Sequence, residues 1–413
     1  MVPNGWEETR LKHIARIKSG STPLRAKQDL YYSQDGTPWV KTLDLNNAEI
    51  FETDERITEL ALKETSCSIF PVNTVLVAMY GGFNQIGRTG LLTVPSAINQ
   101  ALSGLMLDGT KADSKYILNY LNGNVRQWKK FAASSRKDPN ITREDVCNFE
   151  VLLPPLPEQR KIAKILSTWD KAITTTEQLI AASQQQKKAL MQQLLTGKKR
   201  LLNPETGKVF EGDWERHSLS DLVHVDKKSL GKKTPDDFEF KYISLSDVAT
   251  GTIGVNLEVH KYATAPSRAR RVLQNGDVLL STVRPNLKGF AKISQKHADC
   301  IASTGFSVLT PKKRVSGDYI YQYIFSSHVT GQIDSLVVGS NYPAINSSDV
   351  AGLKIYCPTY EEQQKIASVL TSADREIELL ETKLAHLKDE KKALMQQLLT
   401  GKRRVKIEEM EIA

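Results

Sequence analysis

The chain of 413 residues contains few cysteines and histidines and no long apolar run. Its four cysteines lie far apart without CxxC spacing, and its seven histidines show no paired-ligand spacing. We therefore expect no zinc site and no disulfide framework. No apolar run approaches the roughly eighteen residues of a transmembrane helix, and the N-terminal segment has no apolar signal-peptide core. These absences predict a cytoplasmic protein with reduced thiols and no membrane partner.

Motifs for nucleotide and methyl-transfer chemistry are also missing. The pairs Gly197-Lys198 and Gly207-Lys208 are followed by Lys199 and Val209, not by the Ser or Thr of a phosphate-binding loop. No Asn/Asp-Pro-Pro-aromatic motif of an amino-methyltransferase is present. The acidic stretch around residues 236–241 is too compact to place nuclease carboxylates on adjacent strands. We predict no catalytic residues and no cofactor or metal bound by this chain.

The chain has more basic than acidic residues, 56 Lys and Arg against 47 Asp and Glu. Its formal net charge is +9, and its isoelectric point is near 9.1. Such a balance favours a polyanionic partner, most simply nucleic acid.

The most informative feature is an internal repeat. The sequence KKALMQQLLTGK occurs at residues 187–198 and again, unchanged, at residues 391–402. The same register extends from PEQRKIAKIL at residues 157–166 against EEQQKIASVL at residues 361–370, and it ends with GKKR against GKRR. A gapless repeat of about forty residues indicates a chain built as two related halves.

Each copy of the repeat has the apolar spacing of a coiled-coil helix. The apolar steps alternate between four and three, with Lys391 as the polar break in the second copy. The seam consists of Ile162, Leu166, Trp169, Ile173, Thr176, Ile180, Ser183, Leu190 and Leu194, and of Ile366, Leu370, Ala373, Ile377, Leu380, Leu384, Leu387, Leu394 and Leu398. A helix of about forty residues spans about 60 Å, too long for one small domain to cover. We expect the two helices to pair antiparallel as struts; two independent amphipathic helices on domain cores are the alternative.

The segments before each helix repeat the same order of elements. VNTVLVAMY at residues 72–80 and GDVLLSTV at residues 276–283 are predicted strands, each followed by a polar turn. Residues 116–131 and 319–333 each predict one amphipathic helix, and Tyr116 aligns with Tyr319. The predicted organisation is domain 1 at 1–153, helix 1 at 154–200, domain 2 at 201–357, helix 2 at 358–404 and a tail at 405–413.

Polar and basic residues in tight turns are the candidate contacts to DNA. Arg, Asn and Gln can make bidentate contacts to guanine and adenine, whereas Lys and Ser suit phosphate contacts. Ordinary solvated turns remain the alternative for each of them. The candidates are Arg284, Asn286 and Lys288, then Ser340, Asn341 and Tyr342, and in the first domain Asn84, Gln85 and Arg88.

This pattern resembles the specificity subunit of type I restriction–modification systems over essentially the whole chain. The resemblance is carried by PPLPEQRKIAKIL at residues 154–166, the doubled KALMQQLLTGK, STVRPNLKG at 281–289 and STGFSVLTP at 303–311. SGSTP at 19–23, INQAL at 98–102 and GSNYPAI at 339–345 also look like target-recognition signatures. The resemblance implies an α/β fold class with two homologous target-recognition domains. Two long antiparallel coiled-coil helices would separate these domains, and the two halves would form a pseudo-two-fold internal repeat.

The resemblance also implies partners and a division of labour. Each domain would read one half of a split site in double-stranded DNA. The helices would set the spacer and dock the modification subunits, two in number, which would carry S-adenosylmethionine. A restriction subunit with motor and nuclease would join through the modification subunits. A coiled-coil adaptor holding two protein-binding modules is the main alternative, and a self-contained nuclease or methyltransferase is the third.

Overall fold

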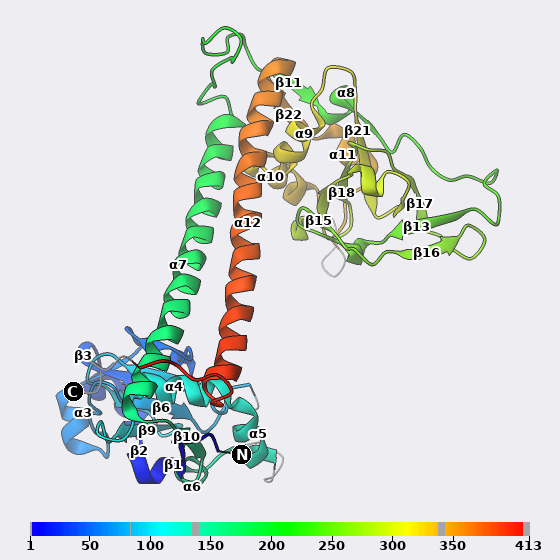
Figure 1. Cartoon of the computed structure of the whole chain (residues 1–413). Coiled ribbons are helices and arrows are strands. Elements are labelled where there is room, and N and C mark those ends of the chain that lie inside the picture. Colours follow the sequence, from blue (N-terminus) through cyan, green and yellow to red (C-terminus); the bar gives the residue numbers. More distant parts are fainter. Residues whose placement is uncertain (1, 83, 134–139, 338–342, 408–413) are drawn as a thin grey trace. The chain divides into compact units, whose positions relative to one another are not determined.

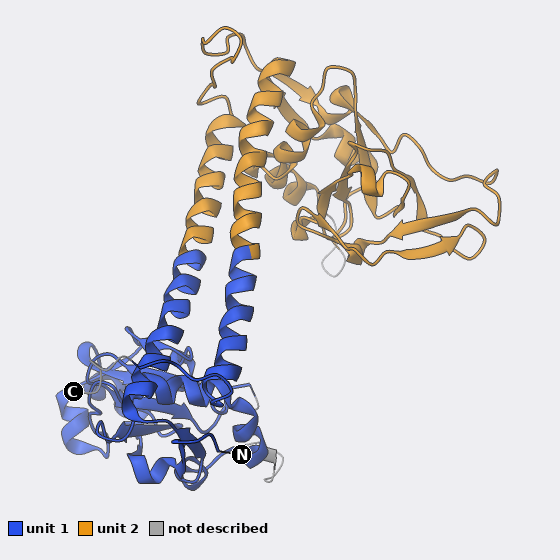
Figure 2. Ribbon diagram, viewed as in Figure 1, with its two compact units in different colours: residues 1–177, 383–413 blue, residues 178–382 orange. Residues whose placement is uncertain are grey.

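The computed structural model describes residues 2–82, 84–133, 140–337 and 343–407. The chain divides into two compact units (Figure 2): residues 1–177 with 383–413, and residues 178–382. Each unit contains one α/β domain and a segment of each of two long helices (Figure 1).

The domain of the first unit is built around a five-stranded sheet in the order β2-β9-β6-β7-β4, with smaller sheets β5-β3-β8 and β1-β10. Its strands are β1 Glu7–Arg10, β2 Ala15–Ser19, β3 Tyr32–Val40, β4 Glu49–Ile50, β5 Arg56–Ile57, β6 Val75–Ala78, β7 Thr89–Leu92, β8 Ala97–Ile98, β9 Leu102–Leu107 and β10 Glu150–Leu153. Its helices are α1 Leu11–Ile14, η1 Arg25–Lys27, α2 Gln28–Tyr31, η2 Thr42–Asp44, α3 Glu59–Glu64, α4 Ser114–Gly123, α5 Val125–Ala133 and α6 Arg143–Cys147.

The domain of the second unit contains two four-stranded sheets, β12-β21-β18-β19 and β16-β13-β20-β17, with the pairs β11-β22 and β14-β15. Its strands are β11 Glu215–Ser218, β12 Val223–Val225, β13 Glu239–Ile243, β14 Val248–Ala249, β15 Thr252–Ile253, β16 Glu258–Lys261, β17 Ala269–Val272, β18 Val278–Ser281, β19 Phe290–Lys292, β20 Ile301–Ser303, β21 Phe306–Pro311 and β22 Lys354–Cys357. Its helices are α8 Leu219–Leu222, η3 Leu245–Asp247, η4 Pro285–Leu287, η5 Gln295–His297, α9 Gly317–Ile324, α10 Ser327–Leu336 and α11 Ser347–Gly352.

The two domains share a topology that the alignment of their sequences predicts. In the first, β6 pairs with β7 and β9, and β3 runs parallel to β8. In the second, β18 pairs with β19 and β21, and β13 runs parallel to β20. β6 and β18 are buried at all four positions, as expected for a central strand rich in Val and Leu.

Tyr116 and Tyr319 have the same role in the two domains. The Tyr116 hydroxyl donates to the carbonyl of Leu152 at 2.7 Å, and the Tyr319 hydroxyl donates to the carbonyl of Tyr356 at 2.6 Å. Both rings are fully buried, and burial raises the pKa of both phenols. The two tyrosines therefore act as neutral donors that tie a core helix to the last strand of each domain.

The helical stretches at residues 116–131 and 319–333 correct a detail of the sequence analysis. Each is two helices instead of one: α4 ends at Gly123 before α5, and α9 ends at Ile324 before α10. Phe325 is the C-cap of α9, and Ser326 starts α10, because its side chain accepts from the Val329 amide as an N-cap. The apolar period continues across both breaks, so periodicity alone did not reveal them.

The repeated segments form α7, Leu156–Leu194, and α12, Tyr360–Leu398. Within the first unit, Asp170 pairs with Lys391 and Glu177 pairs with Lys388. Position numbers rise along α7 as they fall along α12, so the helices run antiparallel. The second unit repeats the arrangement, with Lys187 against Asp374 and Ser183 against Glu376. The predicted seam positions are buried or half-buried along both helices.

Candidate nucleic-acid interface

The turn between β18 and β19 holds three of the predicted DNA-binding residues. Arg284 and Lys288 flank the short helix η4, and both have left-handed backbones, with φ of 48° and 51°. Left-handed backbone is uncommon for residues other than glycine, and such conformations gather at functional sites. Arg284 and Asn286 are exposed, whereas Pro285 between them is buried. The turn thus buries its proline and presents the two polar side chains outward.

Hydrogen bonds fix this turn to a neighbouring segment. The Arg284 amide donates to the carbonyl of Pro343 at 2.7 Å, and the Ile345 amide donates to the carbonyl of Thr282 at 2.9 Å. A β-bridge joins Val283 to Ala344. The end of the GSNYPAI stretch therefore lies beside the β18–β19 turn. Ser340, Asn341 and Tyr342, the predicted residues of this stretch, lie outside the described residues.

The corresponding turn of the first unit connects β6 to β7 and holds Asn84, Gln85 and Arg88. Asn84 is exposed, and the other two are half-buried. Arg88 Nη1 donates to Gln85 Oε1 at 2.7 Å, so the structure brings these two side chains together. Gly87, with φ of 76°, lies against Trp128 of α5: a Cβ there would approach Trp128 Cδ1 to 2.4 Å. Glycine at this position lets the turn rest on α5.

In each unit, an Arg–Glu pair that was not predicted from the sequence lies at the start of a long helix. Glu362, fully buried at the start of α12, accepts two hydrogen bonds of 2.7 Å from Arg200. Glu158, buried at the start of α7, accepts two of 2.7 Å from Arg404. The hydrogen bond with Glu158 raises the pKa of Arg404. Bidentate pairs of this kind are strong and directional.

The repeat itself contained a signal for these pairs. Both the glutamates and the arginines recur at the offset of 204 that relates the two copies. In the sequence alone these residues stand out only as members of the repeated stretches. Their pairing joins the start of one long helix to the segment that follows the other, and that contact is not local in sequence.

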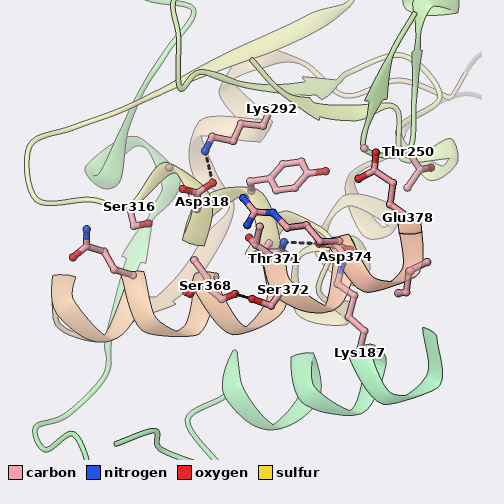
Figure 3. A pocket seen from close by; sticks show the side chains of 18 of the residues that line it. Lys187, Thr250, Lys292, Ser316, Asp318, Ser368, Thr371, Ser372, Asp374 and Glu378 are labelled. Carbon is pink, nitrogen blue, oxygen red and sulfur yellow. Dashed lines mark hydrogen bonds and ion pairs between the residues drawn. The ribbon is translucent and has the colours of Figure 1, made fainter. Parts of the chain in front are cut away.

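A groove along α12 in the second unit has charges of both signs (Figure 3). Lys187 pairs with Asp374, and Lys292 pairs with Asp318. Gln322 Nε2 donates to the free oxygen of Asp374 at 2.8 Å. Arg375, Glu378 and Glu381 also line the groove, so cations and carboxylates are mixed along it and it has no potential of one sign.

A second groove, in the first unit, is strongly basic. It measures about 1440 Å³ and lies between α5 and the last turns of α12. Seven of its described lining residues are Lys or Arg, and one is a carboxylate, Glu150.

Among the described residues, no group of three or more His, Cys, Asp or Glu is arranged to hold a metal ion. No helix of the described chain is long and apolar enough to cross a membrane.

Comparison with known proteins gives consistent matches along the chain. A family model described as the type I restriction modification DNA specificity domain matches residues 3–183 and again residues 211–389. The MjaVIII type I restriction enzyme specificity subunit of Methanocaldococcus jannaschii is 26% identical, and the alignment covers 98% of this chain and 94% of that protein. The EcoKI specificity subunit of Escherichia coli (strain K12) is 20% identical over 88% of this chain and 81% of its own length.

The fold also has solved counterparts. The crystal structure of the type I restriction-modification S subunit from M. genitalium matches with a TM-score of 0.61 at 14% identity. That match covers 97% of this chain and 98% of the other. Together with the doubled family match, it confirms the predicted class of two repeated α/β domains joined to long helices.

Proposed function

Because the chain belongs to the type I restriction modification DNA specificity family, we propose that it gives a type I restriction–modification complex its sequence specificity. The chain is a non-catalytic subunit. It binds DNA, and the other subunits of the complex supply the enzymatic activities. The family model matches once in each half of the chain, and this doubled match is the observation that carries the proposal. Each domain reads one half of a bipartite site.

The recognition surface of each domain includes the turn that follows its central strand. In the second unit Arg284 and Asn286 contact bases, and Lys288 contacts phosphate. In the first unit Asn84, Gln85 and Arg88 have the corresponding roles. The exposure of Arg284 and Asn286 on a turn fixed by backbone hydrogen bonds supports this assignment. Ser340, Asn341 and Tyr342 complete the surface in our proposal.

The partners are double-stranded DNA, two modification subunits that carry S-adenosylmethionine, and a restriction subunit held through them. The long helices dock the modification subunits and set the spacer between half-sites. Their repeated sequence supports the proposal of two equivalent docking sites. The recognition domains occupy residues 1–153 and 201–357, the helical regions 154–200 and 358–404, and the tail 405–413.

Exchange of one domain tests the proposal. Residues 201–357 are replaced by the matching domain of a relative that reads another target, and methylated motifs are sequenced in cells carrying the system. We expect one half of the split motif to change and the other half to stay. A change in both halves, or in neither, contradicts the proposal. An adaptor without DNA affinity would also show no salt-dependent binding to duplex DNA.

A further inference from the structure

The basic groove of the first unit lies outside the predicted recognition turns and has an unusual charge. We propose that it binds the phosphate backbone of duplex DNA, as a contact that the second unit lacks. The inference rests on the proposed function, because it assumes that the chain binds DNA.

Four cations of the groove are available to an anion. Among the described residues, Arg126, Lys130, Lys392 and Lys402 have no carboxylate partner, and all four are exposed. The remaining cations of the groove are neutralised in part: Lys388 pairs with Glu177, for example, at 2.8 Å. Four unpaired positive charges around one groove repel each other, and a polyanion relieves that repulsion.

The floor of the groove strengthens this potential. Met395, Leu399 and Phe131 line the groove and belong to the apolar core of the unit or pack against it. A Cβ at Gly123 would approach Leu399 Cδ1 to 3.1 Å, so α4 and the end of α12 meet closely below the groove. Low-dielectric walls beneath charges of one sign focus the field into a cleft and raise the local concentration of counter-ions.

Helix α5 lies between the groove and the candidate recognition turn. Trp128 of α5 packs beneath the β6–β7 turn at Gly87, while Arg126 and Lys130 of the same helix are exposed. One short helix therefore supports the turn that holds Asn84, Gln85 and Arg88 and also forms one wall of the basic groove. Arg126 and Lys130 are two positions before and after Trp128, so they lie on the other side of α5 from the turn.

The internal repeat provides a comparison within the same molecule. Residues 187–198 have the same sequence as residues 391–402, and the same pattern of buried and exposed positions. In the first unit the repeated segment faces α5, VRQWKKFAA, which has three cations. The equivalent helix of the second domain, α10, is SHVTGQIDSL and has neither Lys nor Arg. Identical helix surfaces thus have different neighbours, and only the first neighbour is basic.

This difference predicts an asymmetric contribution to affinity. Phosphate contacts position a protein on DNA and carry no sequence information. Loss of the groove cations should therefore weaken binding to every duplex and leave the methylated motif unchanged. Each lost phosphate contact should reduce the slope of log K against log salt by about 0.9.

The test compares the full chain with its variant R126Q/K130Q/K392Q. Binding to a fluorescein-labelled duplex of arbitrary sequence is measured by anisotropy at several salt concentrations. We expect the slope to fall by about 2 to 3. The matched control is Lys188→Gln, the same residue of the repeated sequence in the second unit, for which we expect no change. Single Lys392→Gln against Lys188→Gln repeats the comparison if the triple variant does not fold.

An unchanged slope in a variant that melts like the wild type overturns the inference. Unchanged DNA binding together with loss of the modification subunits in size-exclusion chromatography also overturns it, because the groove would then dock an acidic protein segment. Failure of the wild-type chain to bind any duplex would instead contradict the proposed function. The two failures are therefore distinguishable.

Discussion

Arg284 combines an exposed charged side chain with a backbone conformation that favours glycine. Its φ of 48° and that of Lys288, 51°, place both residues in the left-handed region. A turn built only for stability would gain from glycine at both positions, because glycine adopts this conformation without steric cost. The presence of Arg and Lys at these two left-handed positions supports a role for their side chains.

Glycine substitutions separate the backbone from the side chain at these positions. We expect Arg284→Gly to leave the melting temperature near that of the wild type and to weaken DNA binding by about 1–3 kcal/mol, if the guanidinium makes a bidentate base contact. Lys288→Gly, with the same backbone, should weaken binding to all sequences alike. Anisotropy with cognate and mismatched duplexes measures both. Full-strength binding by Arg284→Gly would remove Arg284 from the interface.

The two Arg–Glu pairs differ in exposure although their sequences repeat. The Arg200 side chain is 21% exposed, and that of Arg404 is 44% exposed, while both glutamates are buried. Removing one partner of a buried pair leaves the other charge uncompensated. Arg404 is the more exposed arginine, so its removal should let water reach the remaining glutamate more easily, and the cost should be smaller in the first unit.

We therefore expect Arg200→Ala to reduce the free energy of unfolding by about 3 kcal/mol or more. Arg404→Ala should cost less, in spite of the same geometry. Urea unfolding of the full chain, followed by tryptophan fluorescence, gives both values. Arg200→Lys is the control that keeps the charge without the bidentate geometry. A larger cost for Arg404→Ala would show that solvent access does not decide the strength of these pairs.

Each unit has one charged pair near the seam, between the two long helices. Lys391 contacts Asp170, and Lys187 contacts Asp374, so the repeat places the same pair in both units. A polar residue within an apolar seam fixes the register of a coiled coil at some cost in stability. We infer that these pairs select one antiparallel register in each unit.

Charge exchange tests this role in the first unit. Asp170→Lys alone should destabilise the unit by about 1 kcal/mol or more, because two lysines would then face each other. The double variant Asp170→Lys/Lys391→Asp should recover most of the loss in urea unfolding. The same exchange at the more exposed pair Glu177 and Lys388 should change little. Absence of recovery in the first double variant would argue against a specific pair.

For the molecule as a whole, helix length is the quantity that the proposed spacer role depends on. Insertion of one heptad after Glu177 in α7 and one after Thr382 in α12 keeps the apolar seam in phase. Seven residues add about 10 Å to each helix, or about three base pairs at 3.4 Å each. We expect the gap of the methylated motif to lengthen by about that amount, with both half-sites unchanged.

Methylome sequencing measures the gap directly. An insertion in α7 alone is the control, because unequal helices cannot keep the seam paired, and we expect loss of methylation there. An unchanged gap in an active complex with both insertions would exclude the helices as the spacer.

The sequence by itself determined the doubled organisation and the two long helices. A gapless repeat and an apolar period are local patterns. They persist over enough residues to predict each long helix and its pairing with the other. The central strands around Val75 and Val278 were predictable for the same reason. The confirmed family resemblance followed from these stretches as well.

Only the tertiary structure decided which residues share a surface. The parallel pairings of β3 with β8 and of β13 with β20 join segments far apart in the chain, and the same is true of the Arg200–Glu362 and Arg404–Glu158 pairs. The break between α4 and α5, the left-handed backbone at Arg284 and the basic wall of α5 beside the repeated helix also depend on tertiary packing. Contacts of this kind form between residues whose sequence separation hides them from any local period, because the free energy that fixes them comes from packing across the fold.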